Sequence, residues 1–96
     1  MPPLTTDFER PGARPYFLWD EEMTTEELRR RLAGSDETER LRLMTKMLRE
    51  ARDLDVWEFV RPHEVARDLH RIAHRLGRRR PFWEFLIEGW REDGLV

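Results

Sequence analysis

Arginine residues recur at helical spacing in the most basic part of the chain. Residues 61–80 contain seven arginines against two acids, Glu64 and Asp68, which gives a net charge of +5. In a helix that begins at Pro62, four of these arginines fall on one side, because each residue turns the helix by about 100°. The four are Arg67, Arg71, Arg75 and Arg78. Such a face is either a solvated outer surface or a binding surface for an anionic partner, which would be an acidic protein or a phosphate backbone. Arginine slightly favours binding, because a guanidinium group holds carboxylates and phosphates through paired hydrogen bonds.

Three histidines lie beside the arginines: His63, His70 and His74. His70 and His74 are four residues apart, a spacing at which two imidazoles on one helix can share a metal ion. A structural metal site needs further ligands, and the neighbouring arginines would repel a cation. We therefore interpret the histidines as surface residues and predict neither a metal nor another cofactor.

The last predicted helix is apolar over a wide part of its circumference. Its apolar residues and its glycine spread over about 200°, whereas a surface helix usually has a narrower apolar stripe. These residues are Phe82, Trp83, Phe85, Leu86, Ile87, Gly89 and Trp90. Either the helix is central and residues 16–19 cover its far side, or part of it forms an interface with a partner.

No group of residues has the pattern of a catalytic centre. The chain has no cysteine, which excludes disulfides, thiolate metal sites and a cysteine nucleophile. The one serine, Ser35, follows Gly34 in a predicted turn, and the acidic pairs stand at helix starts, where carboxylates cap helices. No phosphate-binding glycine loop, zinc-protease motif or nucleophile elbow is present. We predict that the protein is not an enzyme and has no catalytic residues.

The length and charge of the chain limit its domain number, its core and its location. Ninety-six residues suffice for one domain with a modest core, and 40% of them are charged. The net charge of −2 averages unlike parts, because residues 1–60 carry ten basic and fourteen acidic residues and residues 81–96 carry one and four. The first ten residues do not resemble a signal peptide, and no run approaches the ~20 apolar residues of a membrane span. We expect a cytoplasmic protein without a membrane segment.

The elements that position these side chains are predicted to be helices. Residues 1–15 contain four prolines and no periodicity, so we expect a flexible arm followed by a helical domain over residues 16–96. The apolar residues 16–19 directly follow Pro15 and are expected to form an extended strip or a lone strand. Capping residues, prolines and glycines then delimit the helical segments 24–34, 36–52, 55–59, 62–76 and 82–92. The predicted fold is all-α, a small single-domain bundle of four to five short helices with an extended N-terminal arm.

Three blocks of the sequence carry a family resemblance. They are Phe17-Leu18-Trp19-Asp20, the segment KMLREARDLDVW over residues 46–57, and the aromatic segment 82–90. Together they resemble a family of small bacterial and archaeal proteins that are often encoded beside AbiEii-type nucleotidyltransferase toxins. Lys46 stands where the family pattern has arginine, and residues 78–80 are not part of that pattern.

The resemblance implies a helical partner of a nucleotidyltransferase toxin, either its antitoxin or an accessory subunit. We therefore predict a non-catalytic protein-interaction module. The predicted partner contacts are Tyr16, Phe17, Trp19, Arg67, Arg71, Arg75, Arg78, Trp83, Ile87 and Trp90.

Two alternative functions stay open. One is a regulator that binds nucleic acid through the arginine face, although residues 62–76 contain no Asn, Gln, Ser or Thr for base recognition. The other is a plain structural domain that forms a homodimer through Trp83 and Trp90.

Overall fold

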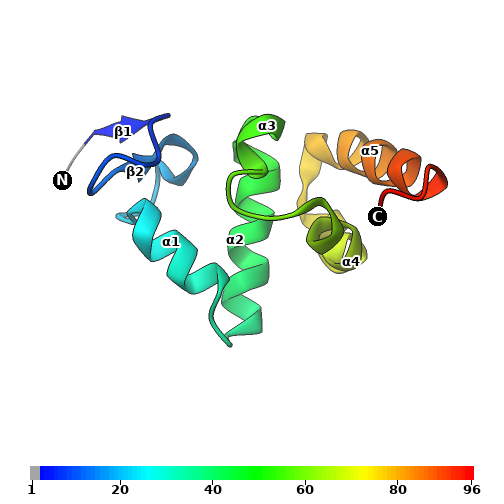
Figure 1. The fold of residues 1–96 in the computed structure, drawn as a ribbon, viewed down its shortest axis with the longest axis horizontal. Coiled ribbons are helices and arrows are strands. Elements are labelled where there is room, and N and C mark those ends of the chain that lie inside the picture. The colour runs from blue at the N-terminus through cyan, green and yellow to red at the C-terminus, as the bar shows by residue number, and fades with distance from the viewer. Residues whose placement is uncertain (1–2) are drawn as a thin grey trace.

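Helix α2 (Glu37–Glu50) runs through the middle of the molecule, with the N-terminal segments on one side and the C-terminal helices on the other (Figure 1). The computed structural model describes residues 3–96, and the molecule measures 43 × 26 × 23 Å. Five α-helices and one two-stranded sheet make up the regular structure of the described residues, together with short 3₁₀ turns. The predicted all-α fold is confirmed.

The N-terminal side consists of a small sheet, a 3₁₀ turn and one helix. Strand β1 (Leu4–Thr5) pairs in parallel with β2 (Arg14–Pro15), with Leu4 opposite Arg14. The turn η1 (Tyr16–Leu18) follows at once, and α1 (Thr25–Leu32) then packs against α2. As the sequence predicts, the side chain of Thr24 caps α1 and that of Asp36 caps α2, each by accepting a backbone N–H three residues on.

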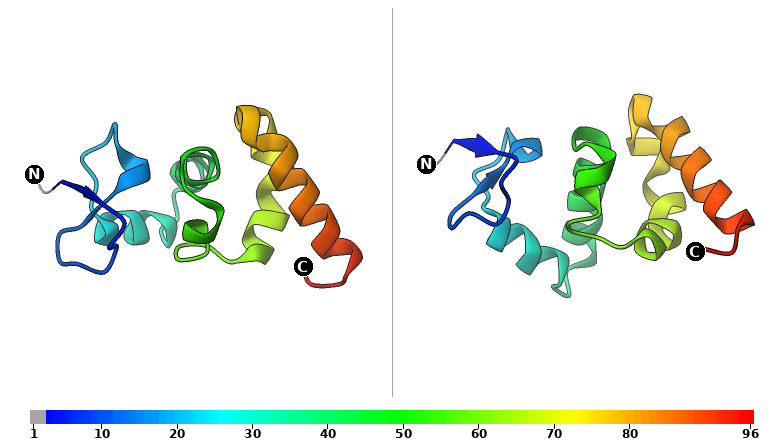
Figure 2. Two further views of the ribbon diagram at one scale, coloured as in Figure 1. Left: turned by 90° about the horizontal axis from the view of Figure 1, so that it is seen from above. Right: turned by 45° about the horizontal axis from the view of Figure 1, so that its top comes forward.

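The C-terminal side consists of three helices joined by tight turns. These are α3 (Asp53–Val56), α4 (Pro62–Ile72) and α5 (Arg80–Glu92), with η2 (Ala73–Arg75) and η3 (Gly77–Arg79) between the last two. Figure 2 shows α4 and α5 together on the side of α2 that faces away from the sheet. The helix predicted over residues 62–76 is shorter, because the backbone leaves helical geometry at Ile72 (φ −123°, ψ −5°). Gly77 then adopts a φ of +54°, which suits glycine and ends the run as predicted.

One hydrophobic core joins the two sides. Four side chains of α2 are completely buried, and they belong to a cluster that includes apolar residues from both sides of the helix. These are Leu43, Met44, Met47 and Leu48. On the C-terminal side, Trp83 is also fully buried, and its indole N–H donates a hydrogen bond of 2.8 Å to the carbonyl of Leu48. This bond satisfies the one polar group of a large buried ring.

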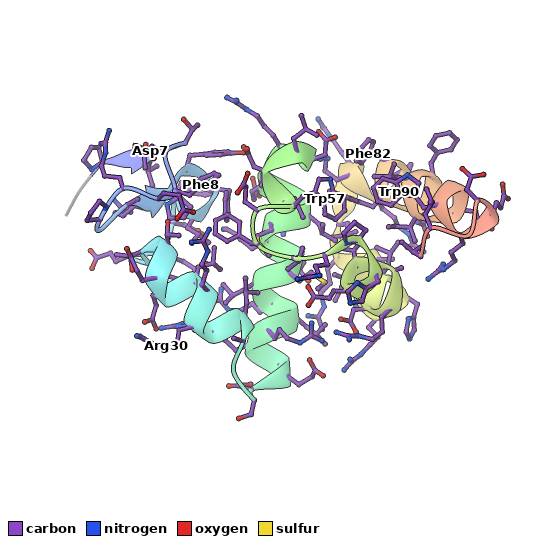
Figure 3. The ribbon with its side chains drawn as sticks, in the orientation of Figure 1. Asp7, Phe8, Arg30, Trp57, Phe82 and Trp90 are labelled. Carbon is purple, nitrogen blue, oxygen red and sulfur yellow. The ribbon has the colours of Figure 1, made fainter. Side chains whose placement is uncertain are left out.

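The segment predicted as a flexible arm packs on the core instead. The ring of Phe8 is buried, with its centroid 5.9 Å from that of Phe17 and 5.2 Å from that of Phe59 (Figure 3). The backbone N–H of Thr25 donates to the carbonyl of Ala13, which ties the end of the segment to the start of α1. Residues 3–15 therefore pack on the rest of the fold, and residues 1–2 lie outside the described part of the chain. The buried ring of Phe8, the pairing of β1 with β2 and this backbone hydrogen bond together hold the segment.

Residues 16–18 form a 3₁₀ turn and not the expected strip or strand. The extended backbone ends at Pro15 (φ −57°, ψ 135°), and the carbonyl of Leu18 then accepts a hydrogen bond from the N–H of Glu21. The turn buries Phe17 and Leu18 against α2. It therefore does not reach α5, which lies at the other end of the molecule (Figure 1).

Candidate functional site

Two of the four predicted arginine contacts are engaged within the fold. Arg67 and Arg71 both face Asp68, whose Oδ2 lies 3.2 Å from Nη2 of Arg67 and whose Oδ1 lies 3.6 Å from Nη1 of Arg71. Asp68 is only 2% exposed, and Arg40 of α2 donates a further hydrogen bond of 2.9 Å to its Oδ2. This carboxylate therefore joins α2 to α4, and it neutralises part of the arginine face.

The charge of Asp68 is maintained despite its burial. Burial alone would raise the pKa of Asp68, but the hydrogen bonds from Arg67 and Arg40 outweigh it and hold the pKa below its usual value. Sequence reasoning missed this role, because Arg40 lies 28 residues away and nothing in the local pattern connects the two.

Arg75 and Arg78 are the two predicted arginines that stay free to bind. Neither forms an ion pair with any residue of the range 3–96, and both are exposed. Arg49, at the end of α2, is likewise exposed and without such a pair, and it lines the same surface hollow as Arg75. Arg79 donates a hydrogen bond of 3.0 Å to the carbonyl of Ala51, which holds η3, and Arg78 with it, at this end of α2.

We call Arg49, Arg75 and Arg78 the basic edge. Arg49 and Arg75 of this edge line the hollow, and so do two acids, both of which already have partners. Arg42 holds Glu21 through two hydrogen bonds of 3.0 and 2.9 Å, and Lys46 lies 2.6 Å from Asp20. The hydrogen bond from Lys46 also lowers the pKa of Asp20. The basic edge therefore keeps a positive charge that no carboxylate of the described chain balances.

Trp19 lies beside the basic edge and remains a candidate contact. Its side chain is 58% exposed, and the ammonium group of Lys46, which also lines the hollow, lies 4.9 Å from its ring centroid. The predicted contacts Tyr16 and Trp90 are only half-buried, but both have structural partners. The hydroxyl of Tyr16 donates to Asp55 at 2.6 Å, and the ring of Trp90 lies 5.6 Å from that of Trp57.

Three predicted partner contacts prove to be core residues. Phe17 is 1% exposed, and Trp83 and Ile87 are completely buried. Their side chains cannot reach a partner while the chain is folded, so these three predictions are corrected. The physical reason is the same in each case, because α2 offers a continuous apolar surface that these side chains cover from its two sides.

The exposed aromatic surface lies elsewhere on α5. Phe85 is 82% exposed and Phe82 is 39% exposed, while Leu54 of α3 is 76% exposed. The wide apolar arc of residues 82–90 predicts such a surface. The arc does not show which of its residues are covered, because that depends on which side of α5 meets α4.

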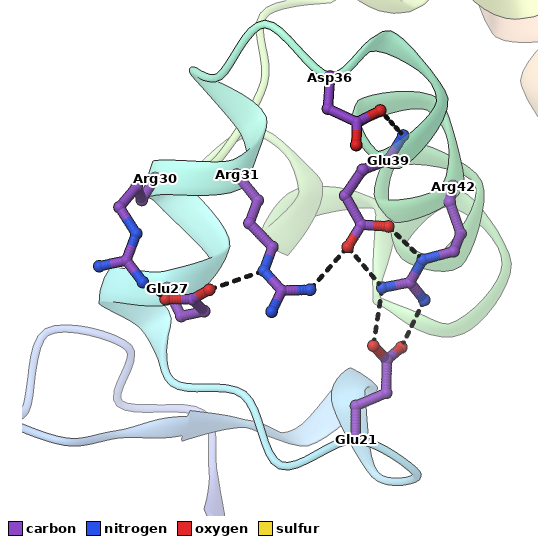
Figure 4. A network of polar contacts seen from close by, with 7 residues as sticks. All are labelled: Glu21, Glu27, Arg30, Arg31, Asp36, Glu39 and Arg42. Atoms are coloured by element: carbon purple, nitrogen blue, oxygen red, sulfur yellow. Dashed lines mark hydrogen bonds and ion pairs between the residues drawn. The ribbon is translucent and has the colours of Figure 1, made fainter.

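The most extensive charged cluster binds α1 to α2, and each of its arginines is paired with a carboxylate (Figure 4). Glu39 accepts hydrogen bonds from Arg31 at 2.7 Å and from Arg42 at 2.6 Å, and Arg42 continues to Glu21. Glu27 pairs with Arg30 and Arg31 at the other end of the cluster. The hydrogen bond from Arg42 is the main cause that lowers the pKa of Glu39 to about 2.

Other kinds of site find no support in residues 3–96. The three histidines are exposed, and no three His, Asp or Glu side chains of the described residues gather where they would hold a metal ion. None of the helices in that range combines the length and the apolar character that crossing a membrane requires. The hollow beside Arg67 and the hollow beside Arg75 are open and lined by mixed charges, so these candidate sites are surfaces and not enclosed pockets.

Comparison with known protein families, with curated proteins and with solved structures finds no match to this chain.

Proposed function

We propose that this chain is a non-catalytic protein-interaction module whose basic edge, together with Trp19, binds an acidic surface of a partner protein. The observation that carries the proposal is the grouping of unpaired arginines. Apart from Arg61, every arginine of residues 3–96 outside the basic edge has an ion pair, a hydrogen bond or an aromatic ring as its partner.

The chemistry of the edge favours a protein partner. Neighbouring guanidinium groups repel one another, and a carboxylate surface would relieve that repulsion and accept several of their N–H donors. Arginine and tryptophan are also enriched among the residues that contribute most to protein interfaces. Trp19 supplies an exposed ring next to the charges.

The partner we propose is a nucleotidyltransferase toxin encoded nearby, with this chain as its antitoxin or an accessory subunit. This part rests on the family resemblance of residues 17–20, 46–57 and 82–90. A nucleotidyltransferase holds its catalytic metal ions with carboxylates, and the basic edge is complementary to such an acidic site. The complex would form in the cytoplasm, the location that the sequence leads us to expect.

Binding of nucleic acid is the competing function for the same arginines. Two of the four arginines on α4 and the following turns are already engaged by Asp68, which leaves a short cationic surface on an acidic protein. The discriminating measurement is a titration of random-sequence duplex DNA at several salt concentrations. We expect no steep salt-dependent binding near physiological ionic strength, and strong binding there would favour the competing function.

The protein-binding function is tested by co-expression with the neighbouring nucleotidyltransferase and by calorimetric titration of the purified pair. The double variant Arg49→Glu/Arg75→Glu reverses two charges of the basic edge, and we expect at least a tenfold loss of affinity. The matched control is Arg61→Glu, because Arg61 is also exposed and unpaired within residues 3–96 but stands before the first residue of α4, away from the edge. Equal binding by the double variant and the wild type would refute the role of the edge. If the nucleotidyltransferase never associates, the proposed partner is wrong.

A further inference from the structure

The outer side of α5 is an apolar strip that the chain itself does not cover. Phe82, Phe85 and Gly89 fall within about 60° of the helix circumference, since each residue turns the helix by about 100°. Phe85 is 82% exposed, and a side-chain carbon placed on Gly89 would meet no atom within 4 Å. We call these three residues the α5 outer face. Over its length of about 10 Å, it presents two rings and a flat stretch of backbone.

The charges beside the C-terminal part of this strip are acidic and unpaired within the described residues. Glu88, Glu92 and Asp93 form no ion pair with any residue of the described range 3–96. The nearby arginines are engaged elsewhere, because Arg91 donates to the carbonyl of Ala66 at 2.5 Å and Arg80 holds Glu84 at 3.2 Å. The C-terminal end of the strip therefore carries uncompensated negative charge.

No segment of the described chain folds over the strip. Residues 16–19, which the sequence suggests as a cover, lie at the opposite end of the molecule (Figure 1). The chain turns at Gly94 (φ +75°), and the N–H of Leu95 donates to the carbonyl of Trp90. At about 100° per residue, Trp90 lies roughly 140° around the helix from Phe85, so this turn leads away from the outer face.

We propose that the α5 outer face binds a basic amphipathic segment of a protein partner. Apolar side chains of that segment would pack on Phe85 and over Gly89, while its lysines or arginines would pair with Glu88, Glu92 and Asp93. The guanidinium carbon of Arg79 lies 5.4 Å from the ring centroid of Phe82, so the N-terminal end of the strip is basic and the C-terminal end acidic. The segment therefore lies with its most basic part toward Glu92.

The same charges disfavour a second copy of the chain as the occupant. A two-fold axis between two antiparallel helices brings the same flank of each helix together. On this face it would place Glu88 near the acids of the other copy, and like charges at such an interface oppose association. The inference is separate from the proposed function, because it concerns a different surface of the opposite charge.

The test uses the full chain and two synthetic helical probes. One is a peptide with Leu at the a and d heptad positions and Lys elsewhere, and the other is its twin with Glu in place of Lys. Fluorescence anisotropy should show that the Leu/Lys peptide binds and the Leu/Glu peptide does not. Phe85→Ser should weaken binding by about tenfold or more, because the ring supplies most of the exposed apolar area. Glu88→Gln/Glu92→Gln should weaken it by several fold and reduce its dependence on salt.

Matched controls separate this surface from the basic edge. Trp19→Ser removes an aromatic ring that is also exposed, and it should leave peptide binding unchanged, as should Arg49→Glu/Arg75→Glu. Because Phe85 is almost fully exposed, its variant should keep the far-ultraviolet circular dichroism of the wild type. Absence of peptide binding, or equal binding by Phe85→Ser and the wild type, would overturn the inference. It would also be overturned if sedimentation showed a dimer that Phe85→Ser dissociates, because the occupant would then be a second copy.

Discussion

Between α1 and α2 most exposed charges are joined into one network, whereas around α5 and the end of α4 several exposed charges have no ion pair within residues 3–96. Glu39 alone receives hydrogen bonds from two arginines, while Glu88 and Arg75 have no ion pair among residues 3–96. The two regions are similarly rich in charge, so composition does not separate them. The charges between α1 and α2 hold two helices together, whereas those around α5 and the end of α4 remain available to another molecule.

The largest effect on stability is expected from Asp68, the buried acid that pairs with two of the four predicted arginines. Replacement of Asp68 by alanine leaves Arg40, whose side chain is 14% exposed, without its buried counter-charge. Loss of one member of a buried pair costs about 3 kcal/mol, and urea denaturation would measure it. The control Glu88→Ala removes an exposed and unpaired acid, and its expected change lies within about 0.5 kcal/mol. Equal losses in the two variants would show that the contrast between paired and unpaired charges is wrong.

A smaller effect is expected from protonation of the α1–α2 network. Because the pKa of Glu39 in the folded chain is about 2, below its ordinary value of 4.5, its ionised form stabilises the fold at higher pH. This contribution is complete above about pH 4.5 and is lost as the pH falls toward 2. It should amount to about 1 kcal/mol, since the network is only partly buried. In Glu39→Gln, thermal unfolding followed across this range should show a shallower fall in stability than in the wild type. An unchanged pH profile would contradict the role of the network.

The smallest effect is expected at the basic edge. Arg75→Gln removes a charge that has no counter-charge and that shares a hollow with Arg49, so stability should rise by less than about 0.5 kcal/mol. Added salt should diminish the gain, because it screens the repulsion. The comparison variant Arg42→Gln breaks the two hydrogen bonds to Glu21 and those to Glu39, and it should lose about 1 kcal/mol. Denaturation of both variants at low and high salt would measure these changes. If Arg75→Gln lowered the free energy of unfolding as much as Arg42→Gln does, Arg75 would be part of a charge network like that between α1 and α2.

Local signals in the sequence predicted most of the helical architecture. Thr24 and Asp36 mark helix starts, and Gly77 and Gly94 adopt the positive φ values that end the last two helical segments. Such signals act within one turn of the chain, so they can be recognised without knowledge of the fold. Phe8 was missed because it is held by residues far away in the sequence, among them Phe59.

The candidate contacts were predicted less completely, and for the same reason. Arg75, Arg78 and Trp19 stay candidates, since charge and aromatic character are visible in the sequence and the three side chains are exposed. Burial of Phe17 and Trp83 was not, because it depends on which side of each segment meets α2. Arg49 was overlooked because it belongs to a different helix, and only the packing of α4 and η3 on α2 brings it to the hollow that Arg75 also lines.

The central position of α2 also determines how the molecule comes apart. This helix contributes Met44 and Leu48 to a core that both sides share, so neither side has a complete apolar interior once α2 separates from it. Separation of either side exposes α2 and removes support from the other. The two regions that differ so much in their charges therefore form a single cooperative unit, and binding energy gained at one end of the molecule stabilises the whole chain against unfolding.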